Sequence, residues 1–287
     1  MADITTVGVV GGGTMGSGIA YEVIRMTDAQ VILRDINADA IERAQAAMER
    51  YIARPLAKGQ ITIEQAEMWR QRLTYTTEWA DLHVADIVIE AAFEDIHLKQ
   101  SIFKELGAVC KPDAILASNT SGLSITTIAA ACTHPERVIG LHFFNPVPAM
   151  KLVEVIRAYQ TSEATIARAK VFCEQLGKET VLAKDYPGFI TTRIGMMMVA
   201  EGIRCFEEGV GTATDIDTAI HLGYNFPMGP LALADLVGLD VLLHILETHT
   251  ELLGERFRPS PLLRQMVAAG HLGRKSGHGF YEYTEAK

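Results

Sequence analysis

The sequence predicts an α/β fold: a doubly wound, mostly parallel sheet with an inserted helical hairpin, followed by an all-α C-terminal domain. Two observations predict it. Short apolar runs alternate with helical patterns through residues 1–187, and such alternation is typical of parallel strands joined by helical crossovers. After "KDYPGF" (184–189) the strand patterns stop and helical patterns with Gly and Pro breaks follow. We therefore predict a sheet domain over 1–187 and a helical domain over 188–287.

The strands are predicted from apolar runs bounded by glycine or polar residues. In chain order they are residues 4–10, 30–35, 85–92, 114–118, 137–144, 151–156 and 179–183. Helical patterns occupy the segments between them, and we expect helices over 14–26, 95–109 and 162–177. The polar segment 37–71 is too long for one element, and Pro55 and "KGQ" (58–60) divide it into two helices, the inserted hairpin.

Composition excludes several classes of protein. A chain of 287 residues, 48% hydrophobic and 21% charged, is long enough for one large domain or two smaller ones. The net charge of −9 argues against nucleic-acid binding, which needs clustered Lys and Arg. The N-terminus has no basic region, and no apolar stretch is long enough to span a membrane. We expect a cytoplasmic protein without a membrane partner, although a processed mitochondrial chain would look similar.

A glycine-rich loop, "GGGTMG", follows the first strand and opens the first helix. Gly11 permits the tight turn, Gly13 lets a pyrophosphate approach the backbone, and Gly16 allows close helix–strand packing. The helix N-terminus then faces the phosphates. With Thr14 and Met15 between them, these glycines predict a dinucleotide-binding site of the Rossmann type.

The residue at the end of the second strand distinguishes between the two nicotinamide cofactors. Asp35 lies where an acidic residue is expected, about 20 residues beyond the loop. Its carboxylate can bond both ribose hydroxyls and would repel a 2′-phosphate, so we predict NAD as the cofactor. Arg34 beside it leaves NADP open, because an arginine there can bind that phosphate.

Two apolar arms flank a proline-rich bend in "GLHFFNPVPAMKLVEV" (140–155), and each arm carries an ionisable residue. If the arms pair as antiparallel strands about position 148, His142 lies opposite Glu154 on one face of the sheet. A carboxylate beside an imidazole fixes its tautomer and favours the charged form after proton uptake, as a general base requires. A core histidine satisfied by an acid, or a surface ion pair, would show the same pattern. An NAD site favours catalysis, because alcohol oxidation needs both a hydride acceptor and a base.

The chain resembles the short-chain L-3-hydroxyacyl-CoA dehydrogenases, a family that includes bacterial 3-hydroxybutyryl-CoA dehydrogenases. The resemblance runs nearly end to end through these ordered motifs: "GGGTMGSGIA", "VIEAAFEDIHLK", "ASNTSGLSIT", "GLHFFNPVPAMKLVEVI", "DYPGF", "MGPLALADLVGLD" and "GRKSGHGFYEY". It implies NAD-dependent interconversion of a (3S)-3-hydroxyacyl-CoA, such as 3-hydroxybutyryl-CoA, and a 3-ketoacyl-CoA. It also implies an acyl-CoA substrate, a role in β-oxidation of fatty acids, and a homodimer whose helical domain closes over the substrate.

The resemblance implies catalytic roles at three matching positions. His142 corresponds to the catalytic base and Glu154 to its partner. Ser121, in "SNTSG", corresponds to the residue that bonds the substrate's 3-oxygen, where a hydroxyl can support developing charge. On its own, Ser121 would equally suit a helix N-cap or a turn.

Further positions match cofactor-binding and substrate-binding residues of the family. Glu94, Lys99 and Asn119 match positions near the cofactor, although the two charged residues alone would suggest ordinary helix charges. Lys58 matches a lysine that contacts CoA, and a solvated loop lysine is the alternative. Asn145, directly before Pro146, is taken as a substrate-binding residue with them.

Thr192 is a departure from the family pattern. The family usually has P-G-F-x-x-N-R where this chain has "PGFITTR", so Thr192 replaces a substrate-binding asparagine. Either that contact is lost, or the hydroxyl or a water remakes it. Two other functions stay open at this point: a sugar-acid dehydrogenase of the gulonate type, and a non-catalytic NAD-binding structural protein.

Overall fold

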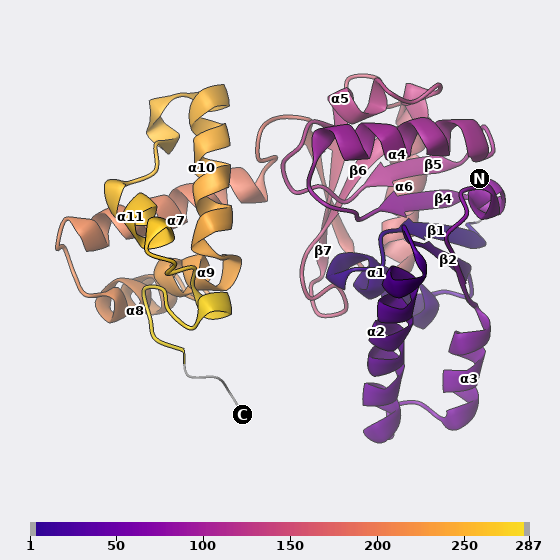
Figure 1. The fold of residues 1–287 in the computed structure, drawn as a ribbon, viewed down its shortest axis with the longest axis horizontal. Helices are drawn as coiled ribbons and strands as arrows, with labels where there is room; N and C mark the ends of the chain where they lie inside the picture. The colour runs from indigo at the N-terminus through magenta and orange to yellow at the C-terminus, as the bar shows by residue number, and fades with distance from the viewer. Residues whose placement is uncertain (1–3, 284–287) are drawn as a thin grey trace. The chain divides into compact units, whose positions relative to one another are not determined.

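An eight-stranded sheet spans residues 6–184 (Figure 1), in the computed structural model that describes residues 4–283. Its strand order is β3-β2-β1-β4-β5-β6-β7-β8. All neighbouring strands are parallel except the antiparallel pair β6 and β7. The predicted doubly wound, mostly parallel sheet is confirmed. The strands are β1 (Thr6–Val10), β2 (Gln30–Arg34), β3 (Leu73–Thr76), β4 (Ile87–Glu90), β5 (Ile115–Ser118), β6 (Val138–Phe143), β7 (Leu152–Arg157) and β8 (Glu179–Lys184).

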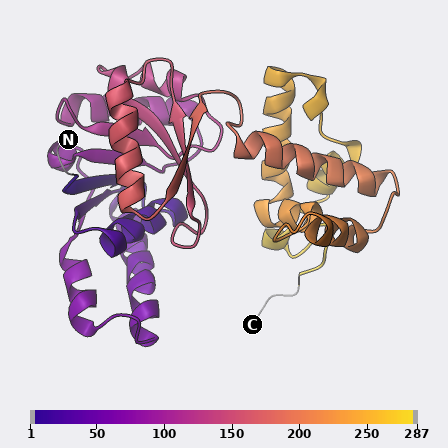
Figure 2. The same cartoon turned by 180° about the vertical axis from the view of Figure 1, so that it is seen from behind.

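Helices cover both faces of this sheet. Figures 1 and 2 show α4 (Ile96–Val109) on one face and α6 (Glu163–Gln175) on the other. Every residue of β4 and β6 is buried as a result, which is why these strands read as continuous apolar runs in the sequence. The core on the α6 face is formed by side chains of α1 (Thr14–Met26), of α6 and of several strands. Among them are Val9, Ile19, Leu33, Ile89, Leu141 and Phe172.

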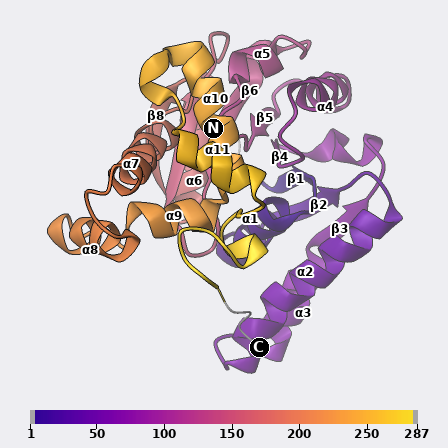
Figure 3. The ribbon, with the colours of Figure 1, turned by 60° about the vertical axis from the view of Figure 1, so that its left-hand side comes forward.

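The inserted hairpin consists of α2 (Ala38–Ala57) and α3 (Ile63–Gln71), which lie side by side in Figures 1 and 3. Pro55 does not divide the two helices as expected, because it sits in the last turn of α2 and the helix continues to Ala57. The break comes at Gly59, which confirms the predicted break at "KGQ" (58–60). Gly59 adopts a left-handed φ of 65°, and Thr62 then caps α3. A proline in the last turn removes only one helical hydrogen bond, whereas the left-handed glycine ends the helix.

Two short elements were not anticipated. Strand β3 is an edge strand of four residues, "LTYT", without a fully buried position. It pairs with β2, and its polar alternation resembles a loop in the sequence. Helix α5 (Ile125–Ala129) is a short helix with Ser124 as its N-cap. Both form because a neighbouring strand or cap is present, and neither has a strong local pattern.

The chain divides into two compact units, Met1–Tyr186 and Pro187–Lys287; residues 1–3 and 284–287 of the predicted domains lie outside the described residues. The second unit is all-helical, as predicted, with its own apolar core that includes Val199, Leu231, Leu242, Phe257 and Leu263. Among residues 4–283, no helix combines the length and apolarity needed to cross a membrane. The helices of the second unit are α7 (Thr191–Glu207), α8 (Ala213–Gly223), α9 (Pro230–Val237), α10 (Leu239–Leu253) and α11 (Pro261–Ala268).

A buried carboxylate fastens the C-terminal segment to this helical unit. Asp235 on α9 is 1% exposed. It accepts hydrogen bonds from the backbone amides of Phe280 and Tyr281, both at 3.0 Å, and from the hydroxyl of Tyr283 at 3.0 Å. These bonds satisfy a charge that would otherwise be strongly unfavourable in an apolar core. Asp235 therefore holds the "GFYEY" segment against α9.

His249 on α10 is buried in the same unit. Its side chain packs edge-on against Phe257, with ring centroids 5.1 Å apart, and its Nδ1 has no hydrogen-bond partner among the described residues. Burial lowers the pKa of His249, and the positive charge of Arg193 lowers it further. The imidazole is thus neutral in the folded protein over a pH range where an unfolded histidine, with a pKa of about 6.5, takes up a proton.

We expect acid to destabilise the protein partly through His249. As pH falls below about 6.5 toward the lower folded pKa, the unfolded chain binds a proton that the folded chain does not, so the free energy of unfolding falls. Urea unfolding followed by far-ultraviolet circular dichroism between pH 8 and pH 5 should show a smaller fall for His249→Gln than for the wild type. His244 on the same helix is exposed, and His244→Gln should follow the wild-type curve. Identical curves for all three proteins would contradict this account.

Candidate active site

A histidine and a glutamate face each other on the antiparallel pair of the sheet. His142 on β6 pairs with Glu154 on β7, which confirms the register expected from the sequence. Nδ1 of His142 lies 2.8 Å from Oε2 of Glu154. Glu154 is fully buried and His142 is 7% exposed. Because a carboxylate only accepts, Nδ1 carries the proton, and Nε2 is the basic nitrogen of the ring.

The carboxyl ends of the central strands gather the other candidates near this pair. Parallel strands end at one edge of a sheet, which is where ligands bind in doubly wound folds. The glycine loop follows β1, Asn119 follows β5, and His142 lies near the end of β6. Oδ1 of Asn119 accepts a hydrogen bond from the backbone amide of Phe143 at 2.9 Å. Asn119 therefore fixes the end of the strand that carries His142.

The glycine loop has the geometry that a pyrophosphate requires. Gly11 adopts a φ of 96°. A Cβ on Gly16 would lie 1.7 Å from the carbonyl oxygen of Gly11, so the loop and α1 approach as closely as predicted. A Cβ on Gly13 would meet nothing within 4 Å, and no side chain caps α1, which starts at Thr14. The helix N-terminus thus has open space where an anionic phosphate is stabilised, and the loop fits NAD.

Asp35 is fixed beside this loop. Its Oδ2 accepts a hydrogen bond from the amide of Gly12 at 2.7 Å, and its Oδ1 accepts one from the amide of Ile36 at 2.7 Å. Both bonds hold the carboxylate at the end of β2, and each oxygen keeps capacity for a further donor. This is the position from which an acidic residue bonds a ribose.

Glu90 is a buried residue that sequence reasoning missed. It ends β4 and is fully buried. Its Oε1 accepts from Nζ of Lys99 at 2.6 Å and from the amide of Ala92 at 2.7 Å, and its Oε2 accepts from the hydroxyl of Ser118 at 2.6 Å. Lys99 is 1% exposed, so it is no ordinary helix charge. The signal in the sequence was a glutamate at the end of the apolar run "IVIE", since such a charge must be paired.

Glu94 connects this buried network to the loop that carries Ser121. Nζ of Lys99 lies 3.3 Å from Oε2 of Glu94. Oε1 of Glu94 accepts hydrogen bonds from the amide of Ser121 at 3.1 Å and from the hydroxyl of Thr120. The structure therefore brings three predicted residues into one network. Within it, Lys99 contacts protein groups and orients Glu94, which holds the Ser121 loop.

The remaining predicted residues are Lys58, Asn145 and Thr192. Lys58 is exposed at the C-cap of α2; a helix of 20 residues is about 30 Å long, so Lys58 lies at the end far from Asp35. Asn145 is exposed in the bend between β6 and β7, where its peptide bond to Pro146 is cis. Thr192 lies half-buried in the first turn of α7, in the second unit.

A second buried ion pair braces the bend that follows the histidine strand. Nζ of Lys178 lies 2.5 Å from Oε1 of Glu22 on α1, and the two side chains are 4% and 1% exposed. The same ammonium donates to the carbonyls of Val147 at 2.7 Å and Met150 at 3.0 Å. Glu22 also pairs with Arg25 at 2.8 Å. The pair thus ties the nucleotide-loop helix α1 to the bend between β6 and β7.

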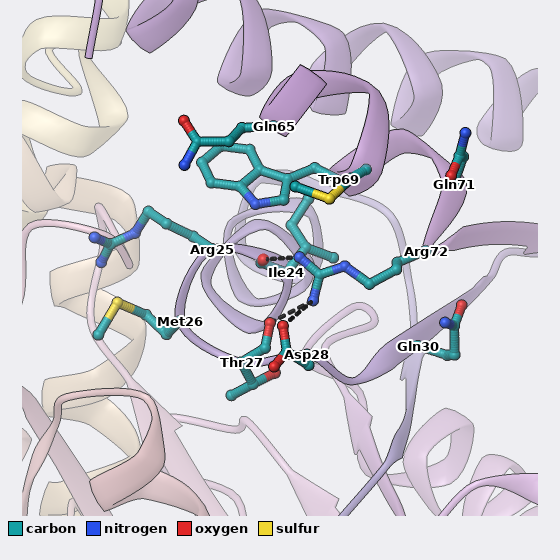
Figure 4. A pocket seen from close by; sticks show the side chains of 11 residues that line it. Ile24, Arg25, Met26, Thr27, Asp28, Gln30, Gln65, Trp69, Gln71 and Arg72 are labelled. Carbon is teal, nitrogen blue, oxygen red and sulfur yellow. Dashed lines mark hydrogen bonds and ion pairs between the residues drawn. The ribbon is translucent and has the colours of Figure 1, made fainter. Parts of the chain in front are cut away.

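A cavity of about 600 Å³ lies near the amino ends of β2 and β3 (Figure 4). The segments that line it come directly before these two strands, so it lies at the opposite edge of the sheet from the glycine loop. Arg72 crosses it and donates to the carbonyls of Ile24, at 2.5 Å, and Thr27. These are carbonyls at the end of α1, and a guanidinium satisfies such groups well. The cavity therefore belongs to the end of a helix and is separate from the cluster around His142.

No group of three or more His, Cys, Asp or Glu side chains that could hold a metal occurs in residues 4–283.

A dinucleotide loop and a basic imidazole at one edge of a doubly wound sheet define an NAD-dependent dehydrogenase. Comparison with known families gives the particular one. Residues 6–186 match the family model for the NAD-binding domain of 3-hydroxyacyl-CoA dehydrogenase, and residues 188–283 match the model for its C-terminal domain. The chain belongs to the 3-hydroxyacyl-CoA dehydrogenase family, which confirms the resemblance and NAD as the cofactor.

Individual relatives match over nearly the whole chain. A 3-hydroxybutyryl-CoA dehydrogenase of Bradyrhizobium diazoefficiens is 45% identical over 287 residues, covering 100% of this chain and 98% of that protein. The crystal structure of (S)-3-hydroxybutyryl-CoA dehydrogenase from Ralstonia eutropha has a TM-score of 0.94 at 42% identity, covering 99% and 100% of the two chains. A 3-hydroxyadipyl-CoA dehydrogenase of Escherichia coli is 41% identical over 285 residues, 99% of this chain and 60% of that protein.

We expect Lys178→Met to destabilise the protein by about 2 kcal/mol, because Glu22 then keeps Arg25 but loses its buried cation, and the carbonyls of Val147 and Met150 lose their donor. Urea unfolding measures this change against the wild type. Glu22→Gln combined with Lys178→Met should recover part of the loss, since the buried carboxylate that has lost one of its two cations is then removed. Equal losses for the single and double variants would show that the packing of Lys178, and not its charge, stabilises the bend.

Proposed function

We propose that the protein interconverts (3S)-3-hydroxybutyryl-CoA and acetoacetyl-CoA. The observation that carries this proposal is the buried His142–Glu154 pair at the edge of the sheet where the glycine loop lies. The relatives named for 3-hydroxybutyryl-CoA, which match end to end, support the substrate. They favour an acyl-CoA over a sugar acid, and the paired imidazole favours an enzyme over a structural NAD-binding protein.

In the proposed mechanism, Nε2 of His142 takes the proton of the substrate hydroxyl. Glu154 keeps the other proton on Nδ1 and stabilises the imidazolium that forms. The hydroxyl of Ser121 donates to the 3-oxygen and supports its negative charge as the carbonyl develops. Bound NAD supplies the acceptor for the hydride that leaves C3. In the reverse direction His142 returns its proton as the acid.

The remaining site residues act by position in this proposal. Glu94 and Lys99 hold the Ser121 loop beside the cofactor, and Asn119 holds the end of β6. Asp35 bonds the ribose, with Gly11, Gly13, Thr14, Met15 and Gly16 forming the pyrophosphate site. Lys58 at the hairpin tip contacts the CoA moiety, and Asn145 and Thr192 contact the acyl portion. Thr192 does so through a hydroxyl in place of an amide.

We further propose that the protein is a cytoplasmic homodimer that acts in β-oxidation. Large apolar side chains are exposed on the helical unit, and such surface commonly marks a subunit interface. Those exposed above 60% in that unit are Ile194, Val210, Leu222 and Tyr224. The helical unit would then serve both to form the dimer and to close over the substrate.

The reaction is tested by following NADH absorbance after addition of acetoacetyl-CoA. We expect rapid oxidation of NADH and little of NADPH. A 3-oxoadipyl-CoA substrate, which carries a terminal carboxylate, should react more slowly if the acyl site is apolar. Turnover of gulonate with NAD and none of acetoacetyl-CoA would replace the proposal with the sugar-acid reaction. Tight NADH binding without turnover of either would indicate a structural protein.

We expect His142→Gln to lower kcat by about 10²- to 10⁴-fold, the usual effect of losing a general base. The Kd for NADH, measured by fluorescence, should stay near the wild-type value because the substitution leaves the glycine loop intact. His134 provides the control: its Nδ1 lies 3.3 Å from Oε1 of Glu136, and both side chains are over half exposed. His134→Gln should keep full activity. A His142→Gln variant that retained most of its kcat would rule out His142 as the base.

A further inference from the structure

The contacts of Arg34 bear on the choice between NAD and NADP. Arg34 ends β2 directly before Asp35. An arginine near this acidic residue can bind the 2′-phosphate of NADP. The amide of Asp35 donates to the carbonyl of Thr76 at 3.1 Å, so the end of β3 lies beside the end of β2. The segment that directly follows β3 therefore starts close to Arg34.

Two contacts hold the Arg34 side chain at the end of β3. Its guanidinium carbon lies 3.7 Å from the ring centroid of Trp79, and its Nε donates to the carbonyl of Thr77 at 3.1 Å. Both Arg34 and Trp79 are half-buried. A planar guanidinium stacked on an indole and tied by a hydrogen bond has little freedom to swing away. Burial also lowers the pKa of Arg34, which agrees with its partial withdrawal from water.

We propose that Trp79 determines cofactor specificity by holding Arg34 over its ring and away from the 2′ position of the adenosine ribose. Of these two side chains, it is then the Asp35 carboxylate that faces that position, where it repels a 2′-phosphate. The 2′-phosphate of NADP would then gain no attraction from Arg34 and would be repelled by the negative charge of Asp35. This inference rests on the proposed role of Asp35 and is independent of the substrate and of the His142–Glu154 pair.

Trp79 could instead serve only to pack the start of the short 3-10 helix at Ala80–Val84. The two roles have different consequences. A packing role would change NADH and NADPH binding alike, because both cofactors share the adenosine ribose. A specificity role changes NADPH binding alone and does so only while Arg34 is present. Direct binding to the full-length protein separates the roles without reference to turnover.

The test is the fluorescence of NADH and NADPH bound to the wild type and to Trp79→Ala. We expect Trp79→Ala to bind NADPH about five- to tenfold more tightly, since a freed guanidinium can form a charge-assisted bond with the phosphate. NADH binding should change less than about twofold. The gain should disappear in the Arg34→Gln/Trp79→Ala double variant. Trp79→Phe keeps an aromatic face, and Trp69→Ala removes the other tryptophan; both should leave NADPH binding near the wild-type value.

Two results would overturn the inference: unchanged NADPH affinity in folded Trp79→Ala, or a gain that persists in the double variant. If Trp79→Ala fails to fold, Trp79→Leu fills more of the space and is judged by the same two results. Asp35→Asn is measured in parallel. Weaker NADH binding by Asp35→Asn together with no effect at Trp79 would refute the specificity role alone, whereas unchanged NADH binding would refute the role of Asp35 on which it rests.

Discussion

The antiparallel pairing of β6 and β7 inside an otherwise parallel sheet is the constraint on which the candidate site depends. A parallel neighbour would need a long crossover, whereas an antiparallel one follows a short bend, so residues only twelve apart face each other. The pairing puts the carboxylate of Glu154 at a fully buried position of the sheet, on the strand next to its edge. His142 pairs with this buried charge, and the same contact orients the imidazole.

Buried ion pairs keep the surrounding loops in place. Glu90 and Lys99 lie beneath the loop of Ser121, and Glu22 and Lys178 lie beneath the bend that follows His142. Neither pair is expected to add much net stability, because desolvation offsets most of the attraction. Each instead satisfies several backbone groups at once and so selects one loop conformation. Rigid loops of this kind are what a reacting alcohol needs, since small misplacements slow proton and hydride transfer.

In the proposed basis of cofactor specificity, the end of β2 accepts NAD and disfavours NADP. Two adjacent residues of opposite charge lie there, and their effects on a 2′-phosphate oppose each other. The outcome depends on which side chain faces the ribose. Asp35 is bonded to the glycine loop, and Arg34 is bonded to the end of the neighbouring strand. In this proposal, these existing contacts decide which of the two side chains faces the ribose, and so decide the preference for NAD over NADP.

The sequence by itself determined the features that depend on neighbours along the chain. The glycine loop, the order of the buried strands and the His142–Glu154 register all follow from local spacing, and the structure agrees with them. Tertiary structure alone decided the rest. The edge strand β3 forms against β2, and the roles of Glu90, Lys178 and Trp79 depend on partners distant in sequence. The sequence gives the charge and size of each side chain. Which distant side chain it contacts depends on how the strands and helices pack together.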